Sequence, residues 1–93
     1  MMLLIMKKVI VYSGSYCPFC VRAKRLLQQK NVPFEEILLD DQPEELIALR
    51  EKTGHRTIPQ IFIGDHFVGG FTELAELESK GLLDQLLSGA ETS

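Results

Sequence analysis

The chain has 93 residues, of which 45% are hydrophobic and 25% are charged, and its formal net charge is −3. This composition predicts a single globular domain over residues 1–93, and the net negative charge argues against a general nucleic-acid-binding surface. No segment is long and apolar enough to span a membrane, and residues 1–6 lack the basic region and cleavage site of a signal peptide. We therefore expect a cytoplasmic protein without a membrane partner.

The first half of the chain predicts alternating strands and helices. Residues 8–13 form a β-branched, apolar run with little alternation, which is typical of a buried central strand. Residues 18–30 predict a helix, and residues 34–39 predict a second strand. The apolar positions of the helix recur at spacings of three and four, namely Cys20, Ala23, Leu26 and Leu27.

A second helix is predicted after this strand. Asp41 and Glu44 have the spacing of a capping box, and Gly54 fits the position just after the helix end. The order strand, helix, strand, helix favours a βαβ unit with parallel strands.

The second half of the chain has a different pattern. Residues 60–63 and 66–69 predict a hairpin around the turn Gly64-Asp65. A helix is expected over residues 72–79 and, after Gly81, a short last helix over residues 82–87.

The two cysteines of the chain lie in Cys17-Pro18-Phe19-Cys20, between the first strand and the first helix. A cysteine at a helix N-cap faces unpaired N–H groups and the positive end of the helix dipole, which stabilise a thiolate. Pro18 suits the first helical position, and Cys20 follows on the same side of the first turn, close enough to form a disulfide with Cys17. The spacing therefore indicates thiol–disulfide exchange.

Two other interpretations of the cysteines remain open. They can be buried core residues or half of a zinc site, although His55 and His66 are separated by ten residues and do not have zinc-ligand spacing. Both histidines are interpreted as surface or turn residues. The charged residues from position 17 to 34 are all basic, and such charges favour a thiolate unless they only form a solvated helix face: Arg22, Lys24, Arg25 and Lys30.

Two further segments suggest a binding groove. Thr57-Ile58-Pro59 precedes the hairpin, where Pro59 can simply end a loop in the trans form. Gly69-Gly70 allows backbone N–H groups to approach a ligand, and the helix start that follows favours an anion such as a carboxylate, although glycine pairs are common in turns. Tyr16 and Phe19 flank the thiols, either as groove walls or as core residues.

Taken together, these segments resemble a dithiol glutaredoxin, most closely the small bacterial glutaredoxin-3 type. The resemblance covers about residues 7–88 and rests on the cysteine motif followed by Arg22-Ala23-Lys24, on Thr57-Ile58-Pro59, and on Gly69-Gly70 followed by Thr72-Glu73-Leu74. It implies an α/β, thioredoxin-like fold, with a four-stranded mixed sheet flanked by helices in the order β-α-β-α-β-β-α plus a short C-terminal helix. It also implies a cis bond between Ile58 and Pro59.

The resemblance further implies a glutathione-dependent oxidoreductase that reduces protein disulfides and glutathione mixed disulfides. Cys17 would be the attacking thiol and Cys20 the resolving thiol, with glutathione as co-substrate, no metal, and a monomeric protein. The glutathione groove would be lined by Tyr16, Thr57, Ile58, Pro59, Gly70, Phe71, Thr72 and Glu73. The N–H groups at positions 71–73 would hold the γ-glutamyl carboxylate, and the side chain of Thr72 or Glu73 would meet its ammonium group.

Two positions depart from the family pattern. Gly14 and Leu46 stand where many family members carry cations or a glutamine that contact glutathione, and Arg22, Arg50 or Arg56 could compensate. One alternative is therefore a thioredoxin-like reductase recycled by a flavoprotein. The other is a dimer that binds a [2Fe–2S] cluster through Cys17 and glutathione, against which Pro18 argues.

Overall fold

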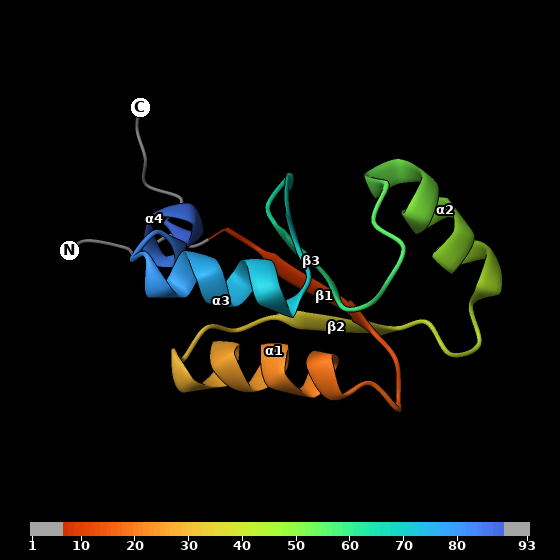
Figure 1. The fold of residues 1–93 in the computed structure, drawn as a ribbon, viewed down its shortest axis with the longest axis horizontal. Coiled ribbons are helices and arrows are strands. Elements are labelled where there is room, and N and C mark those ends of the chain that lie inside the picture. Colours follow the sequence, from red (N-terminus) through yellow and green to blue (C-terminus); the bar gives the residue numbers. More distant parts are fainter. Residues whose placement is uncertain (1–6, 89–93) are drawn as a thin grey trace.

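The computed structural model describes residues 7–88, which form four strands and four helices in the predicted order (Figure 1). The elements are β1 (Val9–Ser13), α1 (Pro18–Gln29), β2 (Glu35–Leu38), α2 (Pro43–Thr53), β3 (Gln60–Ile63), β4 (His66–Gly69), α3 (Phe71–Ser79) and α4 (Leu83–Leu87). The expectations of a strand extension or loose tail at residues 1–6, and of a frayed tail after Ser88, lie outside the described residues. None of the helices within residues 7–88 is long and apolar enough to cross a membrane.

The strands form one mixed sheet in the order β2-β1-β3-β4. β1 is parallel to β2 and antiparallel to β3, and β3 is antiparallel to β4. The prediction that the first strand is central is confirmed, and so is the parallel pairing across the first helix. A parallel pair needs a long crossover, which α1 supplies, whereas β3 and β4 are joined by a tight turn.

Helices cover both faces of the sheet, as the resemblance implied. On one face, α1 and α3 run side by side (Figure 1) and pack with α4 over the larger core, which includes Val11, Leu27 and Leu74. On the other face, α2 places Leu49 against a smaller core with Leu39 and Phe62. All four residues of β3 are buried, because this strand is covered on both sides.

The start of α2 differs from the prediction. Asp41 does not form a capping box with Glu44, because the N-cap is Gln42, whose side chain makes no capping hydrogen bond. Pro43 is the first helical residue, and its fixed φ and missing N–H make that position favourable. The helix end is as predicted, since Gly54 has a left-handed conformation with φ 75°. The remaining ends coincide with the predicted ones or differ from them by one residue.

Candidate active site

The cysteine motif lies at the start of α1, with Cys17 at the N-cap and Pro18 in the first turn, as predicted. Cys17 and Cys20 form a disulfide, with their Cα atoms 5.2 Å apart. The Cys17 sulfur accepts a hydrogen bond from the backbone N–H of Cys20 over 3.1 Å. Cys20 is completely buried, whereas Cys17 is half-buried. When the disulfide is reduced, solvent can therefore reach the first sulfur more easily than the second.

In the reduced protein, the Cys20 N–H and the start of α1 are placed to stabilise a Cys17 thiolate. Of the four basic residues near the motif, Lys24 forms an ion pair with Glu36 at 2.7 Å, and Lys30 pairs with both Glu78 and Asp84 at 2.9 Å. The positive charges of Lys24 and Lys30 are therefore largely neutralised by these carboxylates. The guanidinium of Arg22 lies 5.4 Å from the centre of the Phe19 ring.

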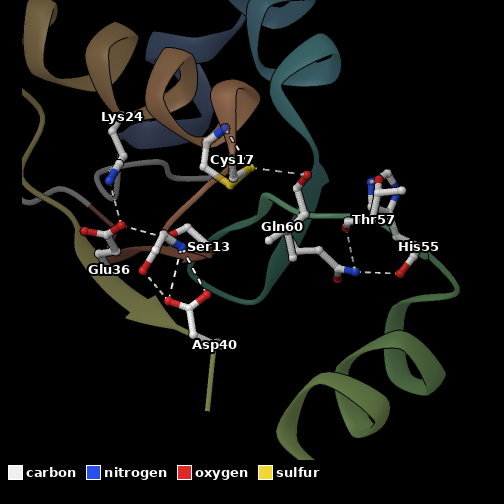
Figure 2. The surroundings of a disulfide bond; sticks show 11 residues. Ser13, Cys17, Lys24, Glu36, Asp40, His55, Thr57 and Gln60 are labelled. Atoms are coloured by element: carbon white, nitrogen blue, oxygen red, sulfur yellow. Dashed lines mark hydrogen bonds and ion pairs between the residues drawn. A yellow bond between two sulfur atoms is a disulfide. The ribbon is translucent and has the colours of Figure 1, made fainter. Parts of the chain in front are cut away.

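The loop before β3 also contacts the disulfide. The Cys17 sulfur is 3.8 Å from the carbonyl oxygen of Ile58 (Figure 2). The sulfur carries no proton in the disulfide, so this contact can become a hydrogen bond only when Cys17 is a thiol. The bond between Ile58 and Pro59 is cis, as the resemblance implied.

A pocket of about 200 Å³ lies between this loop and the start of α3. It is lined by Phe19, His55, Thr57, Ile58, Pro59, Gly70, Phe71, Thr72 and Glu73. Seven of the eight residues predicted for the groove are therefore brought together from two segments that are distant in sequence. Phe19 is 52% exposed and its ring lies 6.3 Å from that of Phe71, so it forms the pocket wall on the side of the cysteine motif.

The start of α3 has the geometry of an anion site. Gly70 is the N-cap, and its N–H donates to the carboxylate of Glu73 over 2.7 Å. Gly69 has φ 121°, and a Cβ at this position would lie only 2.9 Å from the Glu73 side chain. The two glycines thus allow the chain to turn sharply, and the first residues of α3 line the pocket.

The loop at the other side of the pocket is held by the buried side chain of Gln60. Its Nε2 donates to the carbonyl oxygens of His55 at 2.5 Å and Thr57 at 3.2 Å (Figure 2). Its Oε1 lies 2.8 Å from the hydroxyl of Thr53 at the end of α2. Gln60 is fully buried, and its amide groups are satisfied on both ends. This network fixes the backbone that carries Thr57 and Ile58.

A second polar network lies on the other side of the disulfide, towards β2 (Figure 2). The buried Ser13 donates to Glu36 over 2.5 Å, and Lys24 and Ser13 together hold the pKa of Glu36 below its ordinary value. The ion pair with Lys24 is the larger cause. Asp40 accepts hydrogen bonds from the hydroxyl and from the backbone N–H of Ser15, and these lower the pKa of Asp40. The Ser13–Glu36 and Ser15–Asp40 hydrogen bonds together hold the segment that leads to Cys17.

The positions of Tyr16 and His55 relative to the pocket differ from those expected. Tyr16 does not line the pocket; its side chain is fully exposed, and the neighbouring Ser15 is tied to Asp40. His55, which was interpreted as a surface or turn residue, is half-buried and lines the pocket. Its position two residues before Thr57 in the sequence was the only available signal. His66 is exposed at the start of β4, as expected.

The structure also gives reasons for the two departures from the family pattern. A Cβ at Gly14 would lie 3.0 Å from the end of the Ile58 side chain and 3.2 Å from Asp40. Leu46 packs against the smaller core, so this position serves the hydrophobic interior. Arg50 and Arg56 line a different pocket, on the side of α2.

No group of three or more potential metal ligands among His, Cys, Asp and Glu is found in residues 7–88. The cysteine pair with its adjoining pocket is the part of the described chain with the clearest chemistry. The arrangement can exchange disulfides at Cys17 and hold a small anionic ligand beside it.

Comparisons with known proteins agree with this geometry. The family model described as Glutaredoxin matches residues 9–68. A glutaredoxin of Pseudomonas aeruginosa is 49% identical over 83 residues, covering 89% of this chain and 99% of that protein. The solution structure of glutaredoxin from Brucella melitensis is 43% identical, has a TM-score of 0.83, and covers 95% of this chain and 96% of that one. The crystal structure of a buckwheat glutaredoxin–glutathione complex is 33% identical, with a TM-score of 0.83 and coverage of 87% and 76%.

Proposed function

The chain belongs to the glutaredoxin family and is a glutathione-dependent thiol–disulfide oxidoreductase, and from this premise we propose the roles of its residues. Cys17 is the attacking thiol and Cys20 the resolving thiol. The hydrogen bond of 3.1 Å from the Cys20 N–H to the Cys17 sulfur is the observation that supports this order, because it stabilises negative charge on one sulfur only.

With a protein disulfide as substrate, both cysteines take part. The Cys17 thiolate attacks one sulfur of the disulfide, forms a mixed disulfide with it, and releases the other sulfur as a thiolate that takes up a proton. The Cys20 thiol then loses its proton and attacks the Cys17 sulfur, which releases the second substrate thiolate. The enzyme is left with the Cys17–Cys20 disulfide, which two molecules of glutathione reduce while they become glutathione disulfide.

With a glutathionylated protein as substrate, Cys17 is sufficient. Its thiolate attacks the sulfur of the glutathionyl group and releases the protein thiolate. A second glutathione then attacks the Cys17–glutathione disulfide, regenerates Cys17 and leaves as glutathione disulfide. The dithiol and monothiol routes therefore differ in whether Cys20 is needed.

The pocket beside the disulfide binds glutathione in this proposal. The buckwheat protein whose fold is similar was crystallised with glutathione, which supports the assignment. The backbone of Ile58 pairs with the cysteinyl part, next to Thr57 and Pro59. The first N–H groups of α3 bind the γ-glutamyl carboxylate, because the helix start leaves them without intrahelical partners.

The ammonium group of the γ-glutamyl part of glutathione can be bound by the side chain of Glu73 or Thr72. Glu73 already accepts a hydrogen bond from Gly70, but a carboxylate has further acceptor sites, and Thr72 is exposed beside it. Tyr16 joins the groove only if its side chain rotates, since it is now fully exposed. We further propose that the protein acts as a monomer in the cytoplasm on disulfide-containing or glutathionylated proteins.

Alkylation of the reduced protein tests the thiol assignment. We expect iodoacetamide to modify Cys17 with a midpoint below about pH 8.5, the ordinary value for a cysteine, and to modify Cys20 much more slowly. Mass spectrometry locates the modified sulfur. If Cys17 titrates like a free cysteine, or if Cys20 reacts first, the proposed order of the thiols is wrong.

A coupled assay tests the reductant. We expect turnover with glutathione and glutathione reductase, and far less with a thioredoxin-reductase couple. Gly14 and Leu46 lack the cations or glutamine that contact glutathione in many family members, and this gives some support to the thioredoxin-reductase couple as the alternative reductant. Faster turnover with the thioredoxin-reductase couple would establish that alternative.

A further inference from the structure

The imidazole ring of His55 lies in the wall of the proposed glutathione pocket but has no role in the thiol exchange described above. Its Nε2 is 3.3 Å from the hydroxyl of Thr57. It is also 3.5 Å from the position that a Cβ would take on Gly70, the N-cap of α3. The ring nitrogen is therefore directed towards the helix start that is proposed to bind a carboxylate.

His55 is held in place at both its backbone and its ring. Its N–H donates to the Thr53 hydroxyl over 3.1 Å, and its carbonyl accepts from Gln60 over 2.5 Å. The ring meets Phe67 of β4 edge to face, with 5.6 Å between the ring centres. A side chain fixed in this way loses little conformational freedom when it contacts a ligand.

Among the residues that line the pocket with His55, Glu73 is the charged one, and the cations of the adjoining elements lie elsewhere. From α3, the Glu73 carboxylate lies 3.5 Å from the same Cβ position on Gly70, and it already accepts from the Gly70 N–H. From α2, Lys52 places its ammonium 5.4 Å from the centre of the Phe62 ring. Arg56, the next residue in the loop, lines a different pocket, on the side of α2. A protonated His55 would thus add a cation beside the anion-binding end of α3.

We propose that His55 is a ligand-binding residue of this pocket, whose protonated ring donates a hydrogen bond from Nε2 to the carboxylate bound at the start of α3. Glutathionyl ligands then bind more tightly at mildly acidic pH than at mildly alkaline pH. This inference rests on the proposed glutathione pocket.

The oxidised protein allows this to be tested without interference from cysteine titration, since both thiols are in the disulfide. S-methylglutathione, which has no free thiol, serves as the probe, and its binding is followed by NMR at about pH 5.5 and 7.5. We expect wild-type affinity to be about two- to fivefold higher at the lower pH, which is the size of effect typical for a charge at a helix terminus. The His55 ring signals should shift when the probe binds, while those of His66 should not move.

Two variants provide the comparison. His55→Gln keeps a neutral donor and should bind the probe with a much weaker pH dependence, whereas His66→Gln should behave as the wild type. If the probe binds but the wild type and His55→Gln show the same pH dependence, the inference is wrong and the pocket assignment stands. If the probe shifts no amide signals of residues 71–73 at either pH, both the pocket assignment and the inference are wrong.

Discussion

The sulfur of Cys17 lies 3.8 Å from the carbonyl oxygen of Ile58, a residue 41 positions further along the chain. This contact brings the reactive sulfur to the edge of the pocket. The carbonyl oxygen disfavours a negative charge on the Cys17 sulfur, whereas the Cys20 N–H at 3.1 Å favours it. The N–H is the closer group and donates directly to the sulfur, so we expect the thiolate to prevail at neutral pH.

The two cysteines should differ in what their loss removes. Cys17→Ser should abolish both the reduction of protein disulfides and the removal of glutathione from glutathionylated peptides. Cys20→Ser should lose the first activity and keep the second, because a second glutathione can resolve the mixed disulfide. Insulin reduction and release of glutathione from a glutathionylated peptide measure the two activities. A Cys20→Ser variant that fails in both assays, together with an active Cys17→Ser variant, would reverse the assigned roles.

Replacing Gln60 should weaken glutathione binding more than it slows the chemical step. Gln60→Leu removes the donor to the carbonyls of His55 and Thr57, which leaves partly buried acceptors and the Thr53 hydroxyl without this partner and costs about 1–3 kcal/mol in the free energy of unfolding. The loosened loop should raise KM for glutathione several-fold with a smaller change in kcat. Urea unfolding and steady-state kinetics measure these effects.

A matched control for Gln60 is available on α3. Ser79→Ala removes a hydroxyl that donates to the carbonyl of Glu76 in an exposed position away from the pocket. This variant should leave KM unchanged. Equal KM values for Gln60→Leu and the wild type would contradict a positioning role for Gln60.

Glu36 should contribute to stability in a pH-dependent manner. Its pKa is lowered from 4.5, first by Lys24 and then by Ser13, so its contribution is present above that pH and is lost as the pH falls through the folded-state pKa. Glu36→Gln should lower the free energy of unfolding by about 0.5–1 kcal/mol near pH 7, a value typical for partly exposed ion pairs. The variant should also show a shallower decline below about pH 4.5.

The neighbouring Glu35 offers the control for this experiment. It forms an ion pair with Lys8 at 3.1 Å, with both side chains more than half exposed. Glu35→Gln should therefore cost less stability at neutral pH than Glu36→Gln. Chemical unfolding of both variants between about pH 3 and 7 makes the comparison, and indistinguishable curves would count against the Ser13–Glu36–Lys24 network.

A substitution at Gly14 tests the effect of the lysine that many family members carry at this position. Gly14→Lys should bring an ammonium group near the active site and lower KM for glutathione, while Gly14→Ala adds only the Cβ and serves as its control. In both variants the Ile58 side chain must move by a few tenths of an ångström, because the new Cβ would lie 3.0 Å from it. If the lysine variant binds glutathione no better than the alanine variant, the lysine of other family members cannot be restored at this position by a single change.

Local sequence patterns predicted most of the elements. The alternation of strand and helix signals, the hairpin turn at Gly64-Asp65 and the end of α2 at Gly54 all depend on neighbouring residues, and the structure confirms them. The start of α2 was predicted wrongly, because two local signals competed and Pro43 outweighed the spacing of Asp41 and Glu44.

The sequence by itself determined the reactive unit, because Cys17, Pro18 and Cys20 act within one helical turn. Only the tertiary structure decided which side chains surround that unit. His55 entered the pocket wall and Tyr16 did not, since their places depend on how distant segments pack: the buried amide of Gln60 holds one loop, and the contact between Ser15 and Asp40 holds the other. Such long-range contacts leave no periodic pattern in the sequence.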